Sequence, residues 1–295
     1  MVEQDWLAER FEEQRPRLRA VAYRMLGSLS EADDAVQDAW LRFSRTDTSE
    51  VENLGAWLTT VVARVSLNML RSRKTRREQS LEVHLPDPVI DRVDGTDPEH
   101  EALLADAVGL ALLVVLETLA PPERLAFVLH DMFAVPFDDI APIVDRSPEA
   151  ARQLASRARR RVRGAAVPSD VDLAAQWEVV NAFLAAARDG NFDALVAVLD
   201  PDVVLRADGG ATGLSREVRG AETVAGQALL WSEVGLGLRR ALINGAPGIV
   251  SSRDGQPFSV GAVTVRNGKI VEIDILADPE RVSRMDLSML EDPAS

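Results

Sequence analysis

The spacing of apolar residues changes once along this chain, and the change divides it into two parts of different structure. From Trp6 to Arg73, and again from Glu99 to Arg163, apolar side chains recur every three or four residues, which predicts helices. After the segment GAAVPSD (164–170) one more helix is predicted at Leu173–Arg188, and short alternating runs typical of strands follow. A chain of 295 residues is long enough for two or three compact units. The sequence therefore predicts an all-helical part followed by an α+β part.

The helical part begins with two helices separated by a polar loop. In SEADDAVQDAWLRF (30–43) the apolar residues fall on one stripe, and Ser30 is expected to cap the helix ahead of the acids in its first turn. A second helix with a broad apolar face is predicted over Ala56–Arg73. The stretch from Glu78 to Pro98 combines acids and prolines with little periodicity, which indicates a linker.

A helix-turn-helix is predicted near the end of the helical part. A short helix at Asp138–Val144 is followed by a tight turn at Asp145-Arg146, and Pro148 stands where the first turn of a new helix tolerates proline. This second helix is rich in arginine. Two helices joined in this way place the second one in the major groove of DNA.

Charge is distributed unevenly along the chain. The formal net charge of -14 disfavours a nucleic-acid binder as a whole. Local positive potential is sufficient for DNA, however, and two short segments supply it. The segment RSRKTRR (71–77) has five cations and no acid, and Ser147–Arg163 has six arginines against Glu149 alone. Either run taken alone is as well explained by a solvated helix face.

The second part of the chain reads as a helix followed by an antiparallel sheet. Asn267-Gly268 is a strong two-residue hairpin turn. Val263 and Val265 are expected on one face, with Val271, Ile273 and Ile275 on the corresponding face of the next strand, so that Asp274 points outward.

Several classes of function are disfavoured by composition. The chain has no cysteine and three histidines, scattered at His84, His100 and His130, so we expect no metal site and no cofactor. The acidic amino terminus does not resemble a signal peptide, and no apolar stretch is long enough for a membrane span. We therefore expect a cytoplasmic protein without a membrane partner.

Three segments carry a resemblance to a known family. EADDAVQDAWLRF, GAWLTTVVARVSLNMLRSRKTRRE and LAPPERLAFVLHDMFAVPFDDIAPIVDRSPEAARQLASRARRRVRG closely resemble the second and fourth domains of bacterial extracytoplasmic-function sigma factors. The remainder, from LAAQWEVVNAFLAAARDGNFDALVAVLDPDVVLRADGGA onward, looks like a cone-shaped SnoaL-like domain with a curved antiparallel sheet. The chain is similar end to end to the SigJ-like group, whose members carry such a tail.

The resemblance implies a domain organisation and a function. Sigma region 2 is expected at 1–77, an acidic linker at 78–101, sigma region 4 at 102–166, a second linker at 167–171, a SnoaL-like regulatory domain at 172–285 and a tail at 286–295. It also implies a non-enzymatic factor that binds core RNA polymerase and directs promoter-specific transcription initiation, modulated in cis by docking of its C-terminal domain on the sigma domains.

The polymerase contacts implied by the resemblance lie on the first acidic helix. Asp34, Gln37 and Asp38 occupy the positions that contact the clamp helices of the largest catalytic subunit, offset from the apolar stripe. Region 4 is expected to bind the flap of the second-largest subunit. Without the resemblance, these carboxylates read as an exposed acidic face.

Two sets of promoter contacts are implied. Those to the minus-ten element, where cations hold single-stranded DNA, are Arg64, Asn68, Arg71, Arg73, Lys74, Arg76 and Arg77, and the loop Thr46–Asn53 resembles the loop that captures a flipped base. Those to the minus-thirty-five element lie on the arginine-rich helix. Ser147, Glu149, Arg152, Gln153 and Ser156 are placed for base edges, and Arg157, Arg160 and Arg161 for phosphates.

The SigJ-like group has regulatory motifs that this chain carries in altered form. They are HLPDP (His84, Leu85, Pro86, Asp87, Pro88), DGGA (Asp208, Gly209, Gly210, Ala211) and DPERV (Asp278, Pro279, Glu280, Arg281, Val282). In the group, the tail packs against the sigma domains and linker.

Other functions for the tail are weaker. Catalysis would need a base such as Asp208 or Asp274, and the tail has no His, Tyr or Cys to assist it. The aromatic residues Trp177, Phe183, Phe192, Trp231 and Phe258 could line a ligand cavity or form core. The main alternative is a one-component helix-turn-helix transcriptional regulator with a small-molecule-sensing tail, which would leave the arrangement from Ala32 to Arg77 without a task.

Overall fold

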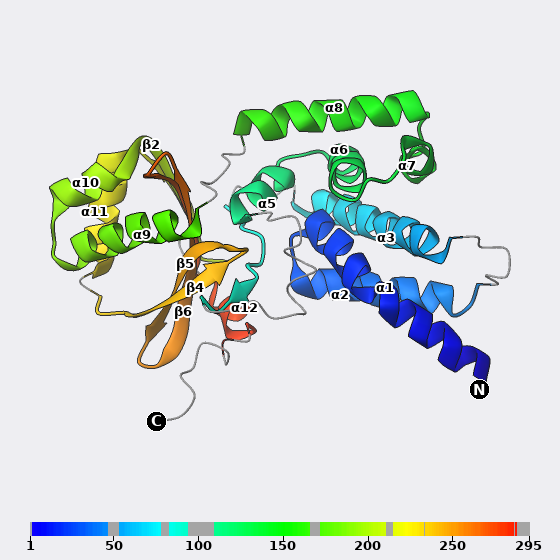
Figure 1. The fold of residues 1–295 in the computed structure, drawn as a ribbon, viewed down its shortest axis with the longest axis horizontal. Helices are drawn as coiled ribbons and strands as arrows, with labels where there is room; N and C mark the ends of the chain where they lie inside the picture. The colour runs from blue at the N-terminus through cyan, green and yellow to red at the C-terminus, as the bar shows by residue number, and fades with distance from the viewer. Residues whose placement is uncertain are drawn as a thin grey trace. The chain divides into compact units, whose positions relative to one another are not determined.

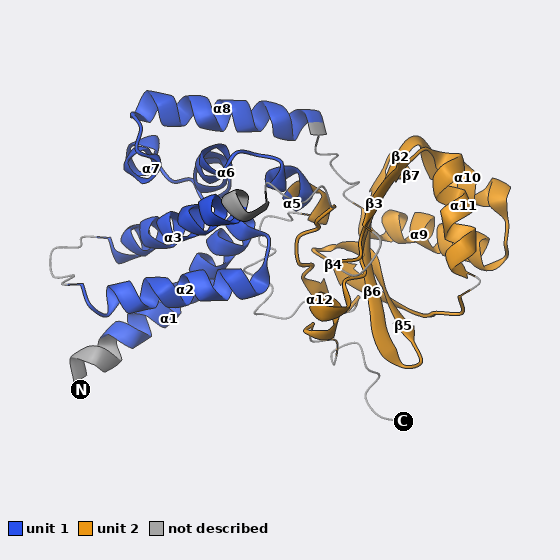
Figure 2. Ribbon diagram, turned by 180° about the vertical axis from the view of Figure 1, so that it is seen from behind, with its two compact units in different colours: residues 1–80, 98–106, 113–165 blue, residues 81–97, 107–112, 166–295 orange. Residues whose placement is uncertain are grey.

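The structure is a computed structural model that describes residues 2–46, 53–77, 83–93, 109–165, 172–210, 215–232, 234–285 and 287. The chain forms two compact units (Figure 2). Unit 1 comprises Met1–Ser80, Pro98–Asp106 and Leu113–Ala165, and unit 2 comprises Leu81–Asp97, Ala107–Leu112 and Ala166–Ser295. Unit 2 therefore includes most of the segment that the sequence identifies as the first linker.

Unit 1 begins with three helices that pack on one another (Figure 1): α1 (Val2–Leu26), α2 (Leu29–Phe43) and α3 (Leu54–Arg77). An aromatic cluster joins them, because Phe11 of α1 contacts Trp40 and Phe43 of α2, and Phe43 contacts Trp57 of α3. Both predicted helices are confirmed, and α3 extends beyond its predicted ends. The predicted cap is wrong: Ser28 caps α2, accepting a hydrogen bond from the Glu31 amide at 3.4 Å, and Ser30 lies inside the helix.

The rest of unit 1 contains α5 (Leu110–Glu117) from Leu113 onward, α6 (Pro121–Phe127), a π-helical turn η1 (Val128–Met132), α7 (Phe137–Val144) and α8 (Pro148–Ala165). The helix-turn-helix is confirmed. Asp145 ends α7 in the left-handed conformation (φ 55°, ψ 50°), and α8 begins at Pro148. Ala151, Ala155 and Ala158 are fully buried, and α8 packs on α6 and α7. This small-residue face leaves Arg152 and Arg160 of α8 exposed.

Unit 2 contains a curved, unclosed sheet in the order β1-β4-β5-β6-β7-β2-β3. The strands are β1 (Ile90–Asp91), β2 (Leu199–Asp208), β3 (Arg216–Arg219), β4 (Gly237–Ile243), β5 (Ala246–Arg253), β6 (Gln256–Arg266) and β7 (Lys269–Leu276). Neighbouring strands are antiparallel except β2 and β7, which run parallel. The sheet is thus mixed, whereas the sequence predicts an antiparallel sheet.

Helices cover the sheet. The helices α9 (Leu173–Arg188), α10 (Phe192–Val198) and α11 (Ala221–Ser232) enclose an apolar core with it, and the short α12 (Pro279–Ser283) packs against β6. The predicted helix at 173–188 is confirmed at both ends. Asp172 caps it by accepting hydrogen bonds from the amides of Ala174 and Ala175. The expected α+β architecture is therefore present.

The hairpin between β6 and β7 forms at Asn267-Gly268, where both residues have positive φ (52° and 69°). A register shift follows directly, because Thr264 pairs with Glu272 and Val265 pairs with Ile270. Val271 therefore has no partner on β6. Ile270 lies in the core at the position predicted for Val271. The outward position predicted for Asp274 is also wrong, since this residue is only 2% exposed.

Candidate nucleic-acid interface

The acidic helix α2 has two faces of opposite character. Ala32, Ala35, Val36, Ala39 and Phe43 are buried against α1 and α3. Asp34, Gln37 and Asp38 are exposed on the other side, as the sequence predicts. Asp38 lies 3.7 Å from Arg42, an exposed pair four residues along the helix that contributes little stability. These carboxylates are thus available to a basic partner.

The cations of α3 differ in their surroundings. Arg64, Asn68 and Arg71 are exposed, and Arg64 donates a hydrogen bond to the Pro142 carbonyl at 3.3 Å. The Arg73 side chain is only 16% exposed and pairs with Glu31 and Glu117, while donating to the Leu26 carbonyl at 3.0 Å. The predicted minus-ten residue Arg73 is therefore already engaged within the protein.

Part of the predicted set lies outside the described structure. The side chains of Lys74, Arg76 and Arg77 are not described, nor are residues 47–52 of the Thr46–Asn53 loop. Between α2 and α3, the structure shows a groove of about 460 Å³ that brings Asp38, Asn68 and Arg73 together. Glu31, Arg42 and Ser72 also line it. The sequence did not single them out, because they lie outside the apolar stripe and outside the contact positions that the resemblance implies.

The predicted base-reading residues lie at the start of α8. Ser147, Glu149, Arg152, Gln153 and Ser156 are all exposed. The Ser147 hydroxyl accepts a hydrogen bond from the Ala150 amide at 3.3 Å, which fixes the first turn. Hydrogen bonds from its own backbone amide and from Ser147 lower the pKa of the exposed Glu149 carboxyl. Glu149 thus presents an ionised acceptor of the kind that reads cytosine amino groups.

Two of the predicted phosphate-contacting arginines share one carboxylate. Glu123 of α6 forms an ion pair with Arg157, whose Nε lies 3.0 Å away, and accepts a hydrogen bond from Arg161 Nη1 at 3.2 Å. Arg159 forms a similar pair with Asp131 at 2.5 Å, whereas Arg160 is exposed. The spacing of four residues between Arg157 and Arg161 places both on one side of the helix. Nothing in the sequence pattern shows that Glu123 lies beside them, because α6 and α8 meet only in the tertiary structure.

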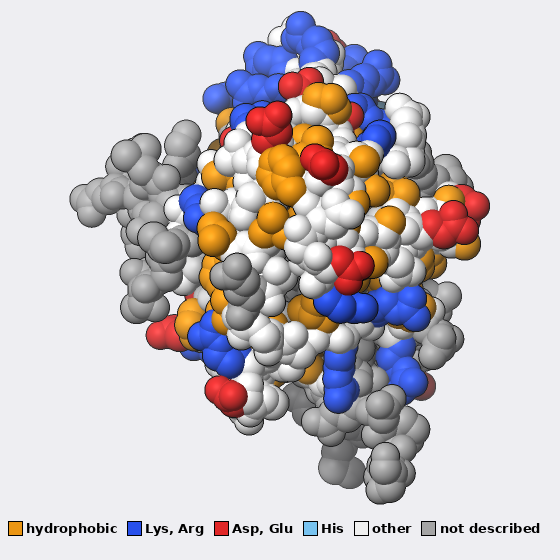
Figure 3. Space-filling view, turned by 90° about the vertical axis from the view of Figure 1, so that its left-hand side faces the viewer, with side chains coloured by type: hydrophobic (Ala, Val, Ile, Leu, Met, Phe, Trp, Pro, Cys, Tyr) orange, Lys and Arg blue, Asp and Glu red, His pale blue; other side chains and the backbone are white. Residues whose placement is uncertain are grey.

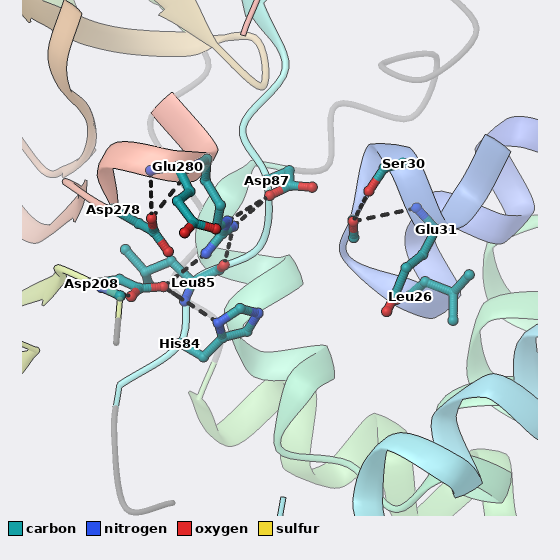
Figure 4. A network of polar contacts seen from close by, with 12 residues as sticks. Leu26, Ser30, Glu31, His84, Leu85, Asp87, Asp208, Asp278 and Glu280 are labelled. Atoms are coloured by element: carbon teal, nitrogen blue, oxygen red, sulfur yellow. Dashed lines mark hydrogen bonds and ion pairs between the residues drawn. The ribbon is translucent and has the colours of Figure 1, made fainter. Parts of the chain in front are cut away.

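The three regulatory motifs, HLPDP, DGGA and DPERV, meet in unit 2 (Figure 4). Asp208 Oδ2 accepts from the Leu85 amide at 2.8 Å and from Arg281 Nη1 at 2.9 Å. Arg281 also donates to the Leu85 carbonyl at 2.7 Å and to Asp87 Oδ1 at 2.9 and 2.5 Å. His84 Nδ1 lies 3.5 Å from Asp208 Oδ2. One arginine thus joins the linker to the DGGA motif.

Backbone geometry supports this network. Gly210 has a φ of +66°, and a Cβ on it would lie 2.3 Å from Asp278 Oδ2. Asp278 in turn caps α12, accepting hydrogen bonds from the Glu280 and Arg281 amides. The linker also extends the sheet, because β1 pairs with β4 and the Val89 amide donates to Asn244 Oδ1 at 3.1 Å. Residues 84–91 are therefore part of the C-terminal fold. Ala211, the last residue of DGGA, lies outside the described residues.

The tail does not assemble a catalytic pair from its two candidate bases. Asp274 accepts a hydrogen bond from Arg206 Nη1 at 3.1 Å, and Arg206 also pairs with Glu272 at 3.3 Å. Asp208 is committed to the linker network described above. The predicted aromatic residues fall into separate groups as well: Trp177 and Phe183 belong to the core, Phe192 is 40% exposed, and Trp231, 44% exposed, lies with its ring centre 6.3 Å from that of Phe258. Figure 3, seen from the side of α10 and α11, shows apolar side chains in separate groups among charged ones.

Asp274 gives the tail domain a predictable pH dependence. Burial raises the pKa of its carboxyl from 3.8 to about 6, more than Arg206 lowers it. Between these values the native state binds more protons than the unfolded state, so stability is lost as the pH rises. We expect raising the pH from about 4 to about 7 to reduce the free energy of opening of β7 by roughly 3 kcal/mol. Hydrogen exchange of β7 amides, corrected for intrinsic rates, measures this change. Asp274→Asn should remove it, and an identical pH dependence in this variant would contradict the assignment.

Within the part of the chain that the structure describes, there is no helix both long and apolar enough to span a bilayer. Groups of three or more potential metal-ligating side chains are likewise missing from those residues.

Comparison with known proteins identifies both halves of unit 1. Residues 10–76 match the Sigma-70 region 2 family, and residues 109–162 match the Sigma-70 region 4 family. These ranges cover most of α3 and α8, the helices with the predicted promoter contacts. The region 2 match gives a role to the part of the chain that the one-component regulator hypothesis leaves unexplained, so that alternative is not favoured.

Relatives match along nearly the whole chain. The ECF RNA polymerase sigma factor SigJ of Mycobacterium tuberculosis is 42% identical over 288 residues, covering 92% of this chain and 91% of SigJ. The probable ECF sigma factor SigI of the same species is 32% identical, covering 95% of this chain and 96% of SigI. The crystal structure of M. tuberculosis SigJ superposes with a TM-score of 0.76 at 36% identity, covering 95% of this chain and 99% of that one.

Sigma factors are not enzymes but transcription initiation factors, and their two sigma domains bind core RNA polymerase and promoter DNA. With both sigma regions matched and relatives that include its C-terminal domain, this chain belongs to the extracytoplasmic-function sigma factors.

Proposed function

We propose that region 2 (α1–α3) grips the clamp helices of the largest polymerase subunit through Asp34, Gln37 and Asp38. The supporting observation is the exposed acidic face of α2 opposite its buried stripe. A ready-made acidic surface favours encounter with a basic partner. Region 4 (α5–α8) binds the flap of the second-largest subunit.

Region 2 also holds the single-stranded minus-ten element. The cations of α3 follow one another along a single helix, with Arg64 and Arg71 exposed and Arg73 at the edge of the α2–α3 groove. Asn68 lines that groove beside Arg73 and can bond a base edge. Lys74, Arg76 and Arg77 continue the run of cations along the chain.

Region 4 reads the minus-thirty-five element through α8. The exposed first turns supply Ser147, Glu149, Arg152, Gln153 and Ser156 to base edges, and Arg157, Arg160 and Arg161 contact phosphates farther along. The buried alanines lie on one side of α8, so the opposite side of its amino-terminal end is accessible to the major groove.

Control in cis runs through the linker. The linker at 78–101 joins the two sigma regions, and its residues 84–91 contact the C-terminal domain. This assignment uses the division proposed from sequence: 1–77, 78–101, 102–166, 167–171, 172–285 and 286–295. Fixing that segment shortens the free chain between region 2 and region 4 and so limits how far they separate. Docking of the tail on the sigma domains is the second part of this proposal.

Run-off transcription tests the proposed function directly. Sigma-free core polymerase is mixed with the full chain, or with a chain ending at Val167, on sheared genomic DNA of the bacterium that encodes it. Discrete promoter-dependent transcripts are expected from the full chain, and truncation should change their amount. Absence of transcripts from both chains would contradict promoter direction, and equal activity would contradict control by the tail.

The roles within α8 are separable by binding measurements. Arg152→Ala should cost about 1–3 kcal/mol at the cognate base pair and relax specificity there. Arg160→Ala should weaken binding to every sequence and reduce the salt slope by about 1. Fluorescence titration of a selected duplex and its single-base variants across a salt series distinguishes the two. Uniform weakening by Arg152→Ala would remove it from the base-reading set.

A further inference from the structure

Region 4 contacts region 2 through arginines that region 2 contributes. Arg17 donates to the Phe133 carbonyl at 3.4 Å, and the Arg24 guanidinium lies 4.9 Å from the centre of the Phe133 ring. Arg64 donates to the Pro142 carbonyl at 3.3 Å, and Arg73 lies 3.7 Å from Glu117. All of these residues belong to unit 1. Two of the four arginines, Arg64 and Arg73, belong to the proposed minus-ten set.

Glu117, the last residue of α5, stands between an arginine of each region. Its Oε1 lies 3.7 Å from Arg73 Nη1 and 3.5 Å from Arg124 Nη1. Arg124 also donates from Nε to the Arg24 carbonyl of region 2 at 3.1 Å. The side chains of Glu117, Arg73 and Arg124 are 14%, 16% and 3% exposed. Charges so little exposed interact strongly, and losing one partner leaves the others uncompensated.

We propose that region 4 competes with minus-ten DNA for Arg64 and Arg73, with the Glu117 carboxylate in the place of a backbone phosphate. A carboxylate and a phosphate offer arginine the same kind of charged oxygen acceptor. The two groups therefore cannot accept hydrogen bonds from the same N–H groups of one guanidinium at the same time. The Pro142 carbonyl oxygen likewise occupies the place of a phosphate oxygen beside Arg64. This inference rests on the proposed minus-ten role of α3, and it makes closing of the sigma regions and minus-ten binding mutually exclusive.

Glu31 has a different role from Glu117, although both pair with Arg73. Glu31 lies on α2, so its pair with Arg73 stays within region 2 when region 4 moves away. Glu117 moves with region 4. Separation of the regions therefore removes one carboxylate from Arg73 and leaves the other to orient it.

The distance between the regions gives the first test. The chain has no cysteine, so Glu9→Cys on α1 and Arg146→Cys before α8 place two spin labels without other changes. Pulsed electron paramagnetic resonance on the full chain should give a short, narrow distance distribution. Glu117→Gln should broaden it and shift it to longer distances. The matched control is Asp131→Asn, which removes an ion pair within region 4 and should leave the distance unchanged.

Binding of a fluorescent, mixed-sequence single-stranded oligonucleotide gives the second test. Glu117→Gln should bind it several-fold more tightly, with a salt slope steeper by about 0.7 for each arginine released. Adding Arg73→Gln to this variant should abolish most of the gain. Circular dichroism establishes that each variant is folded.

The outcomes separate the inference from the function on which it rests. A folded Glu117→Gln chain that keeps the wild-type distance overturns the competition, whatever the role of Arg73 in DNA binding. An opened chain without any gain in DNA affinity overturns both the competition and the minus-ten role of Arg73. Should Glu117→Gln not fold, Glu117→Asp keeps the charge beside Arg124 on a shorter side chain. An unchanged distance in that variant also overturns the inference, and a longer one supports it.

Discussion

Replacing Arg281 with alanine will release the linker from the C-terminal domain and destabilise that domain by about 3–5 kcal/mol. Arg281 donates to Asp208, to Asp87 and to the Leu85 carbonyl, and the Asp208 side chain is only 3% exposed. Without the guanidinium, two carboxylates remain close together with no cation from α12 between them. Repulsion between these carboxylates weakens the contact between the linker and the C-terminal domain. Trypsin cleavage after Arg92, which follows β1, should accelerate strongly, because it requires local release of the linker.

Arg284→Ala is the matched control for this prediction. Arg284 lies three residues beyond Arg281 and pairs with Glu280 at 3.8 Å, with both side chains at least 76% exposed. Removal of such an exposed pair changes stability little. Denaturant unfolding and proteolysis of the two variants should therefore differ. If both behave like the wild-type chain, Arg281 does not fix the linker.

Reversing the charge of the exposed α2 face will strongly weaken association with core polymerase. Asp34→Lys/Asp38→Lys places two cations where a basic partner is expected, and like charges across an interface cost several kcal/mol. A loss of at least about 100-fold in affinity follows, since 1.4 kcal/mol corresponds to tenfold. The fold should persist, because both side chains are exposed. Biolayer interferometry with immobilised core polymerase measures the affinity.

The control for charge alone is Glu12→Lys/Glu13→Lys on α1. These residues are also exposed, and the double variant changes the net charge by the same amount. Association with polymerase should weaken only through the long-range field, which salt screens. Equal losses in the two double variants would show that net charge, rather than the α2 surface, governs binding.

Much of the fold could be read from local sequence. The helices at α2, α3, α7, α8 and α9 follow from apolar spacing, and Pro148 and Asn267-Gly268 mark the start of α8 and the β6–β7 hairpin. Exposure of Asp34, Gln37 and Asp38 follows from the same spacing, because a helix with one apolar stripe must present its other side to solvent. These features depend on neighbours in the chain, and sequence order supplies those neighbours.

Other features depend on residues that are distant in the chain, and only the tertiary structure decided them. Asp274 is buried beside Arg206, which lies on a strand that runs parallel to β7, and the register shift at Val271 likewise arises in the pairing of β6 with β7. The pairing of Glu123 with α8, and of Glu117 with Arg73, joins helices whose relative placement no periodicity encodes.

The sequence by itself determined the helical and α+β parts, the family, and the surfaces proposed for polymerase and DNA. Only the tertiary structure showed which of the proposed DNA-binding cations already have protein partners. Helical and strand periodicity reports which side of an element is buried, whereas the partner of a charged group depends on the three-dimensional approach of separate elements.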